Sequence, residues 1–238
     1  KERSIPIGAP VKQQIDDLEK RKIYLNPFAI PIAGKEMEFG IYIDPTNPLP
    51  KEFKIALFDH KGKFLSIEPF SCDLNREIYT SEIIRSLKMK QADDVGLLVL
   101  SPDWCKSNID PKNVTMGVNF MVRNKKSGDR DLTEFQDSWR NIGLSIKDFP
   151  HWIAPFKSVL GSTMQVGRVL SDEKFRTAIV LANASGNFGY HLSAFVSLDL
   201  YNVKGDKKSH LVRIAPFTCP ILWADEIFEN LREFLGNS

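Results

Sequence analysis

Asp148 and His151, three residues apart in KDFPHW, come closest in this sequence to a catalytic pair. An imidazole that takes up a proton and a carboxylate that orients it are compatible with such a spacing. The chain has no GxSxG, Walker or GxGxxG motif that would add a nucleophile or a phosphate-binding loop. We therefore expect a protein that is not an enzyme, and we keep an enzyme with an interdomain site near His151 as an alternative.

A second group of candidates combines tryptophan rings with polar side chains. Trp139 precedes Arg140 and Asn141 in QDSWRNIG, and Trp152 follows His151. An exposed indole ring beside hydrogen-bonding groups forms a platform on which a sugar ring can stack, although Trp also packs in the interior of β-sandwiches. Our candidate ligand-binding residues are therefore Trp139, Arg140, Asn141, His151 and Trp152, with a glycan as the ligand in this alternative.

We expect no metal ion and no cofactor. The four histidines form none of the close pairs that bind transition metals. Calcium needs a shell of several oxygen ligands, and the segment GDRD, residues 128–131, lacks the acidic pattern of a calcium loop. The glycine-rich ASGNFG, residues 184–189, lies between two predicted strands and is expected to be a hairpin loop.

The three cysteines, Cys72, Cys105 and Cys219, form no CxxC motif. Free cysteine is among the residue types that are most often buried, so buried thiols are expected. A disulfide between Cys72 and Cys219 is the alternative, because these two residues end matching segments of the chain.

The matching segments are EPFSC, residues 68–72, and APFTC, residues 215–219. Each follows an apolar strand, a tight turn with Lys-Gly at Gly62 or Gly205, and a second strand, and each precedes a short helical pattern. Matching flanks in the same order predict an internal duplication. We interpret the pentapeptide as the end of a strand, where its phenylalanine anchors the chain in the core.

The elements that would position these residues are short strands with alternating apolar and polar side chains. Strands are predicted near residues 39–44, 52–59, 63–71, 95–101, 117–124 and 131–137. So many short strands separated by turns are typical of a β-sandwich. The pattern resembles immunoglobulin-like modules at the level of architecture. Together with the matching segments, these strands predict an all-β fold with short helices, built from tandem antiparallel β-sandwiches that arose by duplication.

Three segments are predicted along the chain. Residues 1–22 form an N-terminal segment with a short helix, residues 23–150 the first β-sandwich, and residues 151–238 the second. GLLVL, residues 96–100, is apolar on both faces and predicts a central strand of the first sandwich. The second sandwich is incomplete because no such strand follows its helix. We expect either a continuation past Ser238 or the other domain to fill this gap, because proteins avoid exposed strand edges.

Charge and hydropathy argue against a nucleic-acid partner and against a transmembrane segment. A net charge of +2 over 238 residues gives no sign of the basic face that nucleic acids require. No stretch of the chain is long and apolar enough to predict a transmembrane segment. We therefore expect a non-catalytic β-sandwich interaction or structural protein that mediates protein–protein contacts. Its partner would be a protein, a glycan or a second copy of the chain, and nothing in the sequence indicates a compartment.

Overall fold

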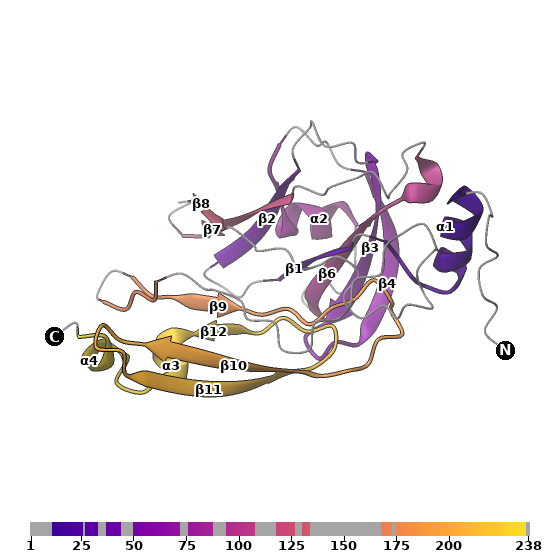
Figure 1. Ribbon diagram of the computed structural model, residues 1–238. Coiled ribbons are helices and arrows are strands. Elements are labelled where there is room, and N and C mark those ends of the chain that lie inside the picture. Colours follow the sequence, from indigo (N-terminus) through magenta and orange to yellow (C-terminus); the bar gives the residue numbers. More distant parts are fainter. Residues whose placement is uncertain are drawn as a thin grey trace.

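The computed structural model of the protein describes residues 11–25, 27–32, 37–43, 50–71, 76–87, 94–107, 118–126, 130–133, 168–172 and 175–236 (Figure 1). Within these residues the protein is mainly β, with antiparallel strand pairs in several sheets and a few short helices. The predicted mainly-β class is therefore confirmed.

Two four-stranded antiparallel sheets form the N-terminal half, which we define as the described residues between 11 and 133. The first sheet has the order β1 (Phe28–Pro31), β6 (Val95–Pro102), β3 (Glu52–Asp59) and β4 (Phe64–Ser71). The second has the order β5 (Ile78–Tyr79), β2 (Met37–Ile43), β7 (Val118–Asn124) and β8 (Arg130–Thr133). Three short helices accompany the sheets: α1 (Val11–Lys20), α2 (Thr80–Ser86) and the 3-10 helix η2 (Trp104–Lys106).

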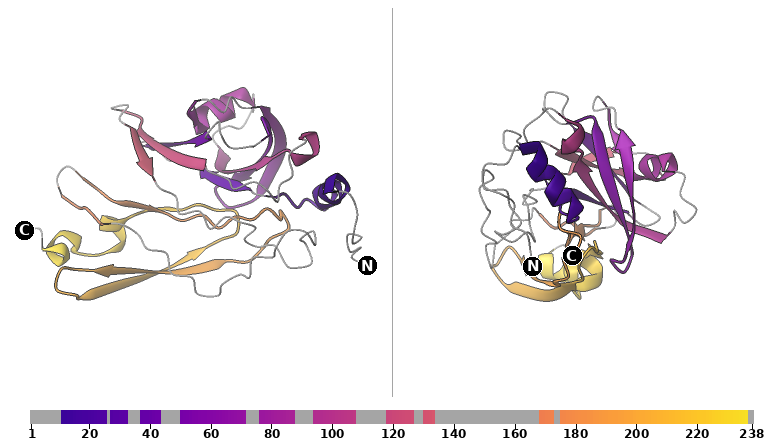
Figure 2. Two further views of the ribbon diagram at one scale, coloured as in Figure 1. Left: turned by 45° about the horizontal axis from the view of Figure 1, so that its top comes forward. Right: turned by 90° about the vertical axis from the view of Figure 1, so that its right-hand side faces the viewer.

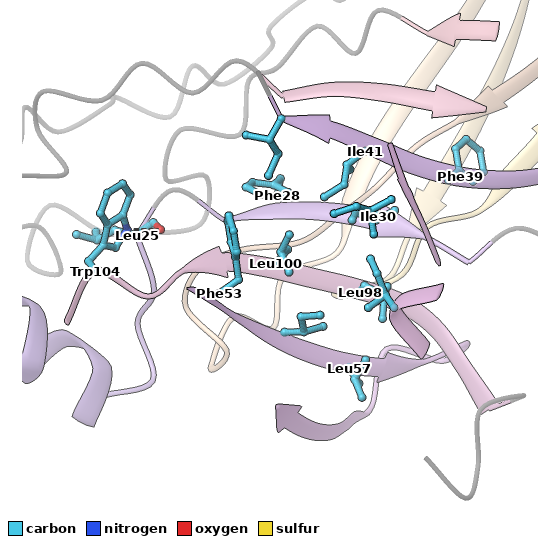
Figure 3. Close-up of a cluster of buried hydrophobic side chains, with 14 of the residues drawn as sticks. Leu25, Phe28, Ile30, Phe39, Ile41, Phe53, Leu57, Leu98, Leu100 and Trp104 are labelled. Atoms are coloured by element: carbon cyan, nitrogen blue, oxygen red, sulfur yellow. Dashed lines mark hydrogen bonds between the residues drawn. The ribbon is translucent and has the colours of Figure 1, made fainter. Parts of the chain in front are cut away.

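The main hydrophobic core lies between these two sheets (Figure 3). Because side chains alternate along a strand, every second residue of β3 and β6 points into it, including Ile55, Leu57, Leu98 and Leu100. Strand β6 lies between β1 and β3 and is buried over nearly its whole length, as its apolar sequence predicts. The strands predicted at 52–59, 63–71 and 95–101 are found within one residue of those bounds.

The C-terminal half, residues 168–236, contains two antiparallel strand pairs. Strand β9 (Ala178–Val180) pairs with β12 (Ile221–Trp223), and β10 (Ala194–Tyr201) pairs with β11 (Lys207–Ile214). The helical segment after β12 is divided into α3 (Ala224–Ile227) and α4 (Leu231–Leu235), because the backbone of Phe228 is extended and Asn230 adopts a φ of 53°. Their apolar side chains form a second core with the strands, which includes Leu198, Leu200, Ile214, Phe228 and Leu231.

The β3–β4 and β10–β11 hairpins close with the same hydrogen bonds. The Asp59 N–H donates to the Lys63 carbonyl at 2.9 Å, and the Asn202 N–H donates to the Asp206 carbonyl at 3.0 Å. In each turn the side-chain oxygen of Asp59 or Asn202 accepts two further backbone N–H groups. The glycine of each turn has a positive φ, 82° in the first hairpin and 87° in the second, as the Lys-Gly pairs predict.

The two copies of the PF[S/T]C motif occupy different places relative to these hairpins. Pro69 and Phe70 lie inside β4, which is an edge strand and therefore tolerates the missing proline N–H. Pro216 and Phe217 lie in a turn after the end of β11, where Phe217 adopts a φ of 55°. The pentapeptide therefore does not mark the same corner twice, whereas the hairpins before it are alike.

The C-terminal half packs on the outer face of the first sheet (Figure 2). Phe58 of β3 and Leu97 and Val99 of β6 meet Ala184 and Phe217 in a separate buried cluster. Segment 184–189 therefore lies between the halves. It is not a hairpin loop, because the flanking strands β9 and β10 belong to different sheets.

Residues 22–24 join the two halves through their backbone. The Tyr24 N–H donates to the Gly186 carbonyl at 2.8 Å, and the Phe188 N–H donates to the Lys22 carbonyl at 3.2 Å. Gly186 is required here because a Cβ would lie 2.1 Å from the Tyr24 carbonyl oxygen. The rings of Tyr24 and Phe188 stack with centroids 4.7 Å apart.

Candidate functional site

The residues that the sequence proposes as a ligand site fall outside the part of the chain that the structure describes. These are Trp139, Arg140, Asn141, His151 and Trp152, together with Asp148. Of the two remaining tryptophans, Trp104 is buried and donates its indole N–H to the Leu25 carbonyl at 3.2 Å. Trp223 is half-buried beneath the guanidinium of Arg176. Neither of these two rings forms an open stacking platform.

Glu19, Asp103 and Cys105 bring potential metal-ligand atoms within 4.8 Å of one another. Lys54 is bonded to Glu19 and lies 3.6 Å from Asp103, so a cation already neutralises this cluster. Burial and the hydrogen bond to Asp16 raise the pKa of the Cys105 thiol, which therefore stays protonated. We interpret the cluster as a polar junction that fastens α1 to the first sheet. Local sequence patterns do not indicate this cluster, because α1 and η2 lie far apart in the chain.

A cavity of about 360 Å³ lies between the halves. Its lining consists of Ile32, Asp59, His60, Gly96, Arg213, Ile214, Ala215, Thr218, Cys219 and Pro220. Burial raises the pKa of Cys219 to about 12, so its thiol is not a nucleophile near neutral pH. Cys219 is a free thiol, so it does not form the alternative disulfide with Cys72, which itself lies outside the described residues.

The carboxylate of Asp59, which also lines this cavity, serves the β3–β4 turn. Burial raises the pKa of Asp59, but the backbone N–H groups of Lys63 and Lys61 outweigh it and the pKa is lowered. Asp59 is therefore an anion that is held by its own hairpin. The cavity therefore offers shape and polar groups for binding a ligand.

The outer face of the β10–β11 hairpin carries large apolar side chains in solvent. Phe195 and Leu211 are 67% and 68% exposed. The guanidinium of Arg213 lies opposite Phe195 in the strand register, 6.0 Å from its ring, and contacts the Ser193 hydroxyl. We call these three residues, Phe195, Leu211 and Arg213, the exposed patch.

Strand β10 also has an edge without a partner among the described residues. It pairs with β11 alone, whereas β3 pairs with β4 on one side and with β6 on the other. The same holds for β9, which pairs with β12 alone, whereas β2 pairs with β5 and with β7. Within the described part of the chain, β9 and β10 therefore each have one strand partner, where β2 and β3 each have two.

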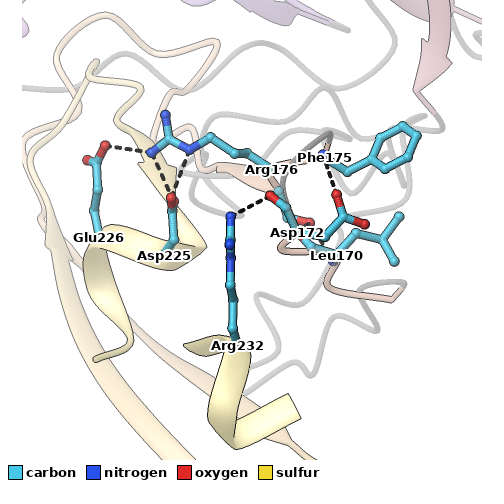
Figure 4. A network of polar contacts seen from close by, with 8 residues as sticks. Leu170, Asp172, Phe175, Arg176, Asp225, Glu226 and Arg232 are labelled. Carbon is cyan, nitrogen blue, oxygen red and sulfur yellow. Dashed lines mark hydrogen bonds and ion pairs between the residues drawn. The ribbon is translucent and has the colours of Figure 1, made fainter. Parts of the chain in front are cut away.

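Charged side chains form a network of ion pairs beside α3 in the C-terminal half (Figure 4). Arg176 donates to Asp225 at 2.8 and 2.9 Å and to Glu226 at 2.9 Å, and its guanidinium lies 4.3 Å above the Trp223 ring. Asp225 lies in the first turn of α3, which begins after Trp223 without a side-chain cap. The carboxylate of Asp225 binds Arg176 instead, and this ion pair lowers its pKa.

In the N-terminal half, too, an arginine lies over the aromatic ring that precedes a helix, but this arginine belongs to a different element. The guanidinium of Arg123, which belongs to β7, lies 3.9 Å above the ring of Tyr79, the residue that precedes α2. Glu38 accepts hydrogen bonds from Arg123 and from the Ser81 N–H and is 4% exposed. In the C-terminal half, Arg176 belongs to the segment that leads into β9. The ion network there therefore forms without a strand equivalent to β7.

No helix of the described residues has the length and apolar character that crossing a membrane requires. Comparisons of the chain with protein-family models, with curated proteins and with solved structures give no match.

Proposed function

We propose that this chain is a non-catalytic interaction module whose C-terminal half binds a protein partner. The observation that carries the proposal is the exposed patch. Contiguous apolar side chains on a protein surface mark interaction sites, and aromatic residues and arginine dominate the binding energy of protein interfaces. Phe195, Leu211 and Arg213 combine these residue types on one face of a sheet.

The strand order supports an immunoglobulin-like architecture for the N-terminal half. In such domains, strand B pairs with E and E with D in one sheet, and C pairs with F and F with G in the other. Here β1 pairs with β6 and β6 with β3, while β2 pairs with β7 and β7 with β8. We infer that these strands correspond to B, E, D, C, F and G, with β4 and β5 inserted between D and E.

The matching hairpins support the proposed duplication. The hydrogen-bonded turn positions of the second hairpin follow those of the first at a constant offset of 143 residues, from Asp59 to Asn202 and from Gly62 to Gly205. Helices α2 and α3 both begin directly after the short strands β5 and β12. We retain the division into an N-terminal segment 1–22 and two β-sandwich domains, 23–150 and 151–238, as part of this proposal.

The chemistry of the described residues favours binding over catalysis. Lys54 pairs with Glu19 and with Asp103, and the Cys219 thiol in the cavity between the halves stays protonated. An enzyme site near His151 remains an alternative, and so does a glycan site at Trp139 or Trp152, which the glycan array below tests.

The test is peptide panning on the immobilised chain, followed by calorimetric titration of synthesised hits. We expect peptides whose affinity falls at least tenfold when Phe195 and Leu211 are both replaced by Ser. Val203→Ser is the matched control, because Val203 is 91% exposed at the hairpin tip outside the patch. Hits that ignore the patch, or no hits at all, would refute the proposal. A glycan-array signal that is lost in Trp139→Ala or Trp152→Ala would favour the glycan alternative.

A further inference from the structure

We propose that the open edge of β10 takes up an extended strand of a protein partner, which lies antiparallel to β10 at the position that β6 has beside β3. This inference rests on the proposed protein-binding function and names the form of the partner. Strand addition to a sheet edge is a recurrent mode of peptide recognition, in which backbone hydrogen bonds supply affinity and alternate side chains supply specificity.

In the N-terminal half, strand β6 covers the corresponding edge of β3. Strand β3 pairs with β6 over the register from Phe53 opposite Pro102 to Asp59 opposite Val95. The Asp103 N–H extends this ladder and donates to the Glu52 carbonyl at 2.8 Å. Backbone groups of an antiparallel strand point alternately to its two neighbours. Glu52, Lys54, Ala56 and Phe58 are therefore the residues whose backbone faces β6.

The same alternation identifies the backbone groups of β10 that have no partner among the described residues. The Asn202 N–H donates across the hairpin to the Asp206 carbonyl, so the even-numbered residues of β10 bond to β11. Phe195, Ser197, Asp199 and Tyr201 therefore direct their N–H and C=O groups to the open edge. Each lies 143 residues after one of the β3 positions that face β6, so the two assignments agree.

Side chains beside the edge define the sequence of the incoming strand. On the inner face, Ala194 and Val196 are half-buried next to the fully packed Leu198 and Leu200, so apolar side chains fit there. The outer face is open, and Asp199 already binds Ser197, Ser209 and Lys207. The partner strand is therefore amphipathic, unlike β6, whose outer face is covered by the C-terminal half.

A partner strand fits better than a second copy of this chain. In the N-terminal half the chain continues from β6 to β7, and β7 covers the edge of β2. A partner that follows this path covers β10 and also the free edge of β9. Two copies that paired through β10 would leave β9 uncovered.

The experiment measures amide hydrogen exchange of the 238-residue chain by NMR, with and without a synthetic peptide. The probe has the sequence of residues 94–102 with Leu97→Thr and Val99→Thr, which makes the outer face of β6 polar, and one added lysine at each end. We expect at least tenfold slower exchange of the amides of Phe195, Ser197, Asp199 and Tyr201 when the peptide is bound. The amides of Leu198 and Leu200 should not change, because they already bond to β11.

Ser197→Pro removes one outward N–H without removing a bond to β11, because proline is tolerated on an edge strand. We expect this variant to keep its melting temperature within a few degrees and to lose peptide binding, whereas Ser197→Ala binds like the wild type. The proposal is supported if the peptide slows amide exchange at every second residue of β10 and this effect is lost in Ser197→Pro.

Two results would overturn it. The first is rapid exchange of the four amides in the presence of saturating probe peptide and of the panned peptides. The second is protection of these amides without peptide, which would assign the edge to a second copy if it depends on protein concentration and to the chain itself if it does not. Panned peptides that bind Ser197→Pro normally but fail on the patch variant would leave the proposed function intact and reject strand addition alone.

Discussion

The rings of Phe58 and Phe217 stack with their centroids 4.2 Å apart and their planes 1° from parallel, which joins β3 to the turn after β11. Phe217 is buried, whereas Phe70, its counterpart in the first PF[S/T]C segment, is half-buried at the margin of the main core. We expect Phe217→Ala to lower the free energy of unfolding by about 3–5 kcal/mol. Phe70→Ala should cost less. Urea unfolding followed by fluorescence measures both losses.

The stack also predicts coupling between its two residues. Because each ring loses its partner when the other is truncated, the double variant Phe58→Ala/Phe217→Ala should lose less stability than the two single variants together. Strict additivity would show that the rings stabilise the fold independently and that the stack itself contributes nothing.

The two glycines of the equivalent turns provide a matched pair of substitutions. Gly205→Ala should cost about 1 kcal/mol, because alanine is strained at positive φ and nothing lies within 4 Å of its Cβ. Gly62→Ala has the same strain, and its Cβ would also lie 2.1 Å from the Pro216 carbonyl oxygen. The loss should therefore be clearly larger for Gly62→Ala in thermal melts. Equal losses would contradict the contact between the first hairpin and the C-terminal half.

The ion pair of Glu38 predicts a dependence of stability on pH. Burial raises the pKa of Glu38, but the hydrogen bonds from Ser81 and Arg123 outweigh it and hold the pKa below the ordinary value of 4.5. A lowered pKa in the folded state stabilises the fold above the unfolded pKa, and this stabilisation is lost as pH falls through the folded value. The unfolding free energy should therefore decline below about pH 4.5, and Glu38→Gln should flatten the decline.

Removing the cation tests the same pair at neutral pH. Arg123→Ala leaves the buried carboxylate of Glu38 without its partner and should cost about 3 kcal/mol. Arg176→Ala is the control, since its pair with Asp225 is much more exposed and should cost about 1 kcal/mol or less. Chemical denaturation at pH 7 measures both, and a larger loss for Arg176→Ala would reverse this ranking.

Thiol chemistry provides a further test. Burial raises the pKa values of Cys105 and Cys219, so both thiols should react slowly with iodoacetamide at pH 8 in the folded chain. In urea both should react at the rate of a free thiol. Peptide mapping by mass spectrometry assigns the modified residue, and rapid labelling of Cys219 in the native state would place it in an open rather than a buried position.

Local patterns predicted much of the fold. Runs and alternation of apolar residues located β3, β4 and β6 to within one residue, and the Lys-Gly pairs located both hairpin turns. These signals arise from neighbouring residues and are visible in any single sequence. The short helical pattern after the second segment forms two helices, because the backbone of Phe228 is extended and Asn230 has a positive φ.

Contacts between distant segments could not be predicted in this way. Nothing local shows that Phe217 would meet Phe58 instead of filling its own half, or that Arg176 would hold Asp225 and Glu226. The candidate site shows the same limit. The exposed patch consists of ordinary strand residues. Their exposure depends on which sheet faces are covered by other parts of the chain, and local sequence does not show this.

The backbone connection between residues 22–24 and 186–188 has a consequence for the order of folding. Ile23 pairs with Asn187, so the beginning of the described chain finds this partner only after most of the chain has been synthesised. The two sheets of the N-terminal half can form earlier, with Phe58, Leu97 and Val99 facing water. During translation the nascent chain therefore exposes an aggregation-prone apolar face. A chaperone that binds this face would protect the chain from aggregation until the C-terminal strands are synthesised.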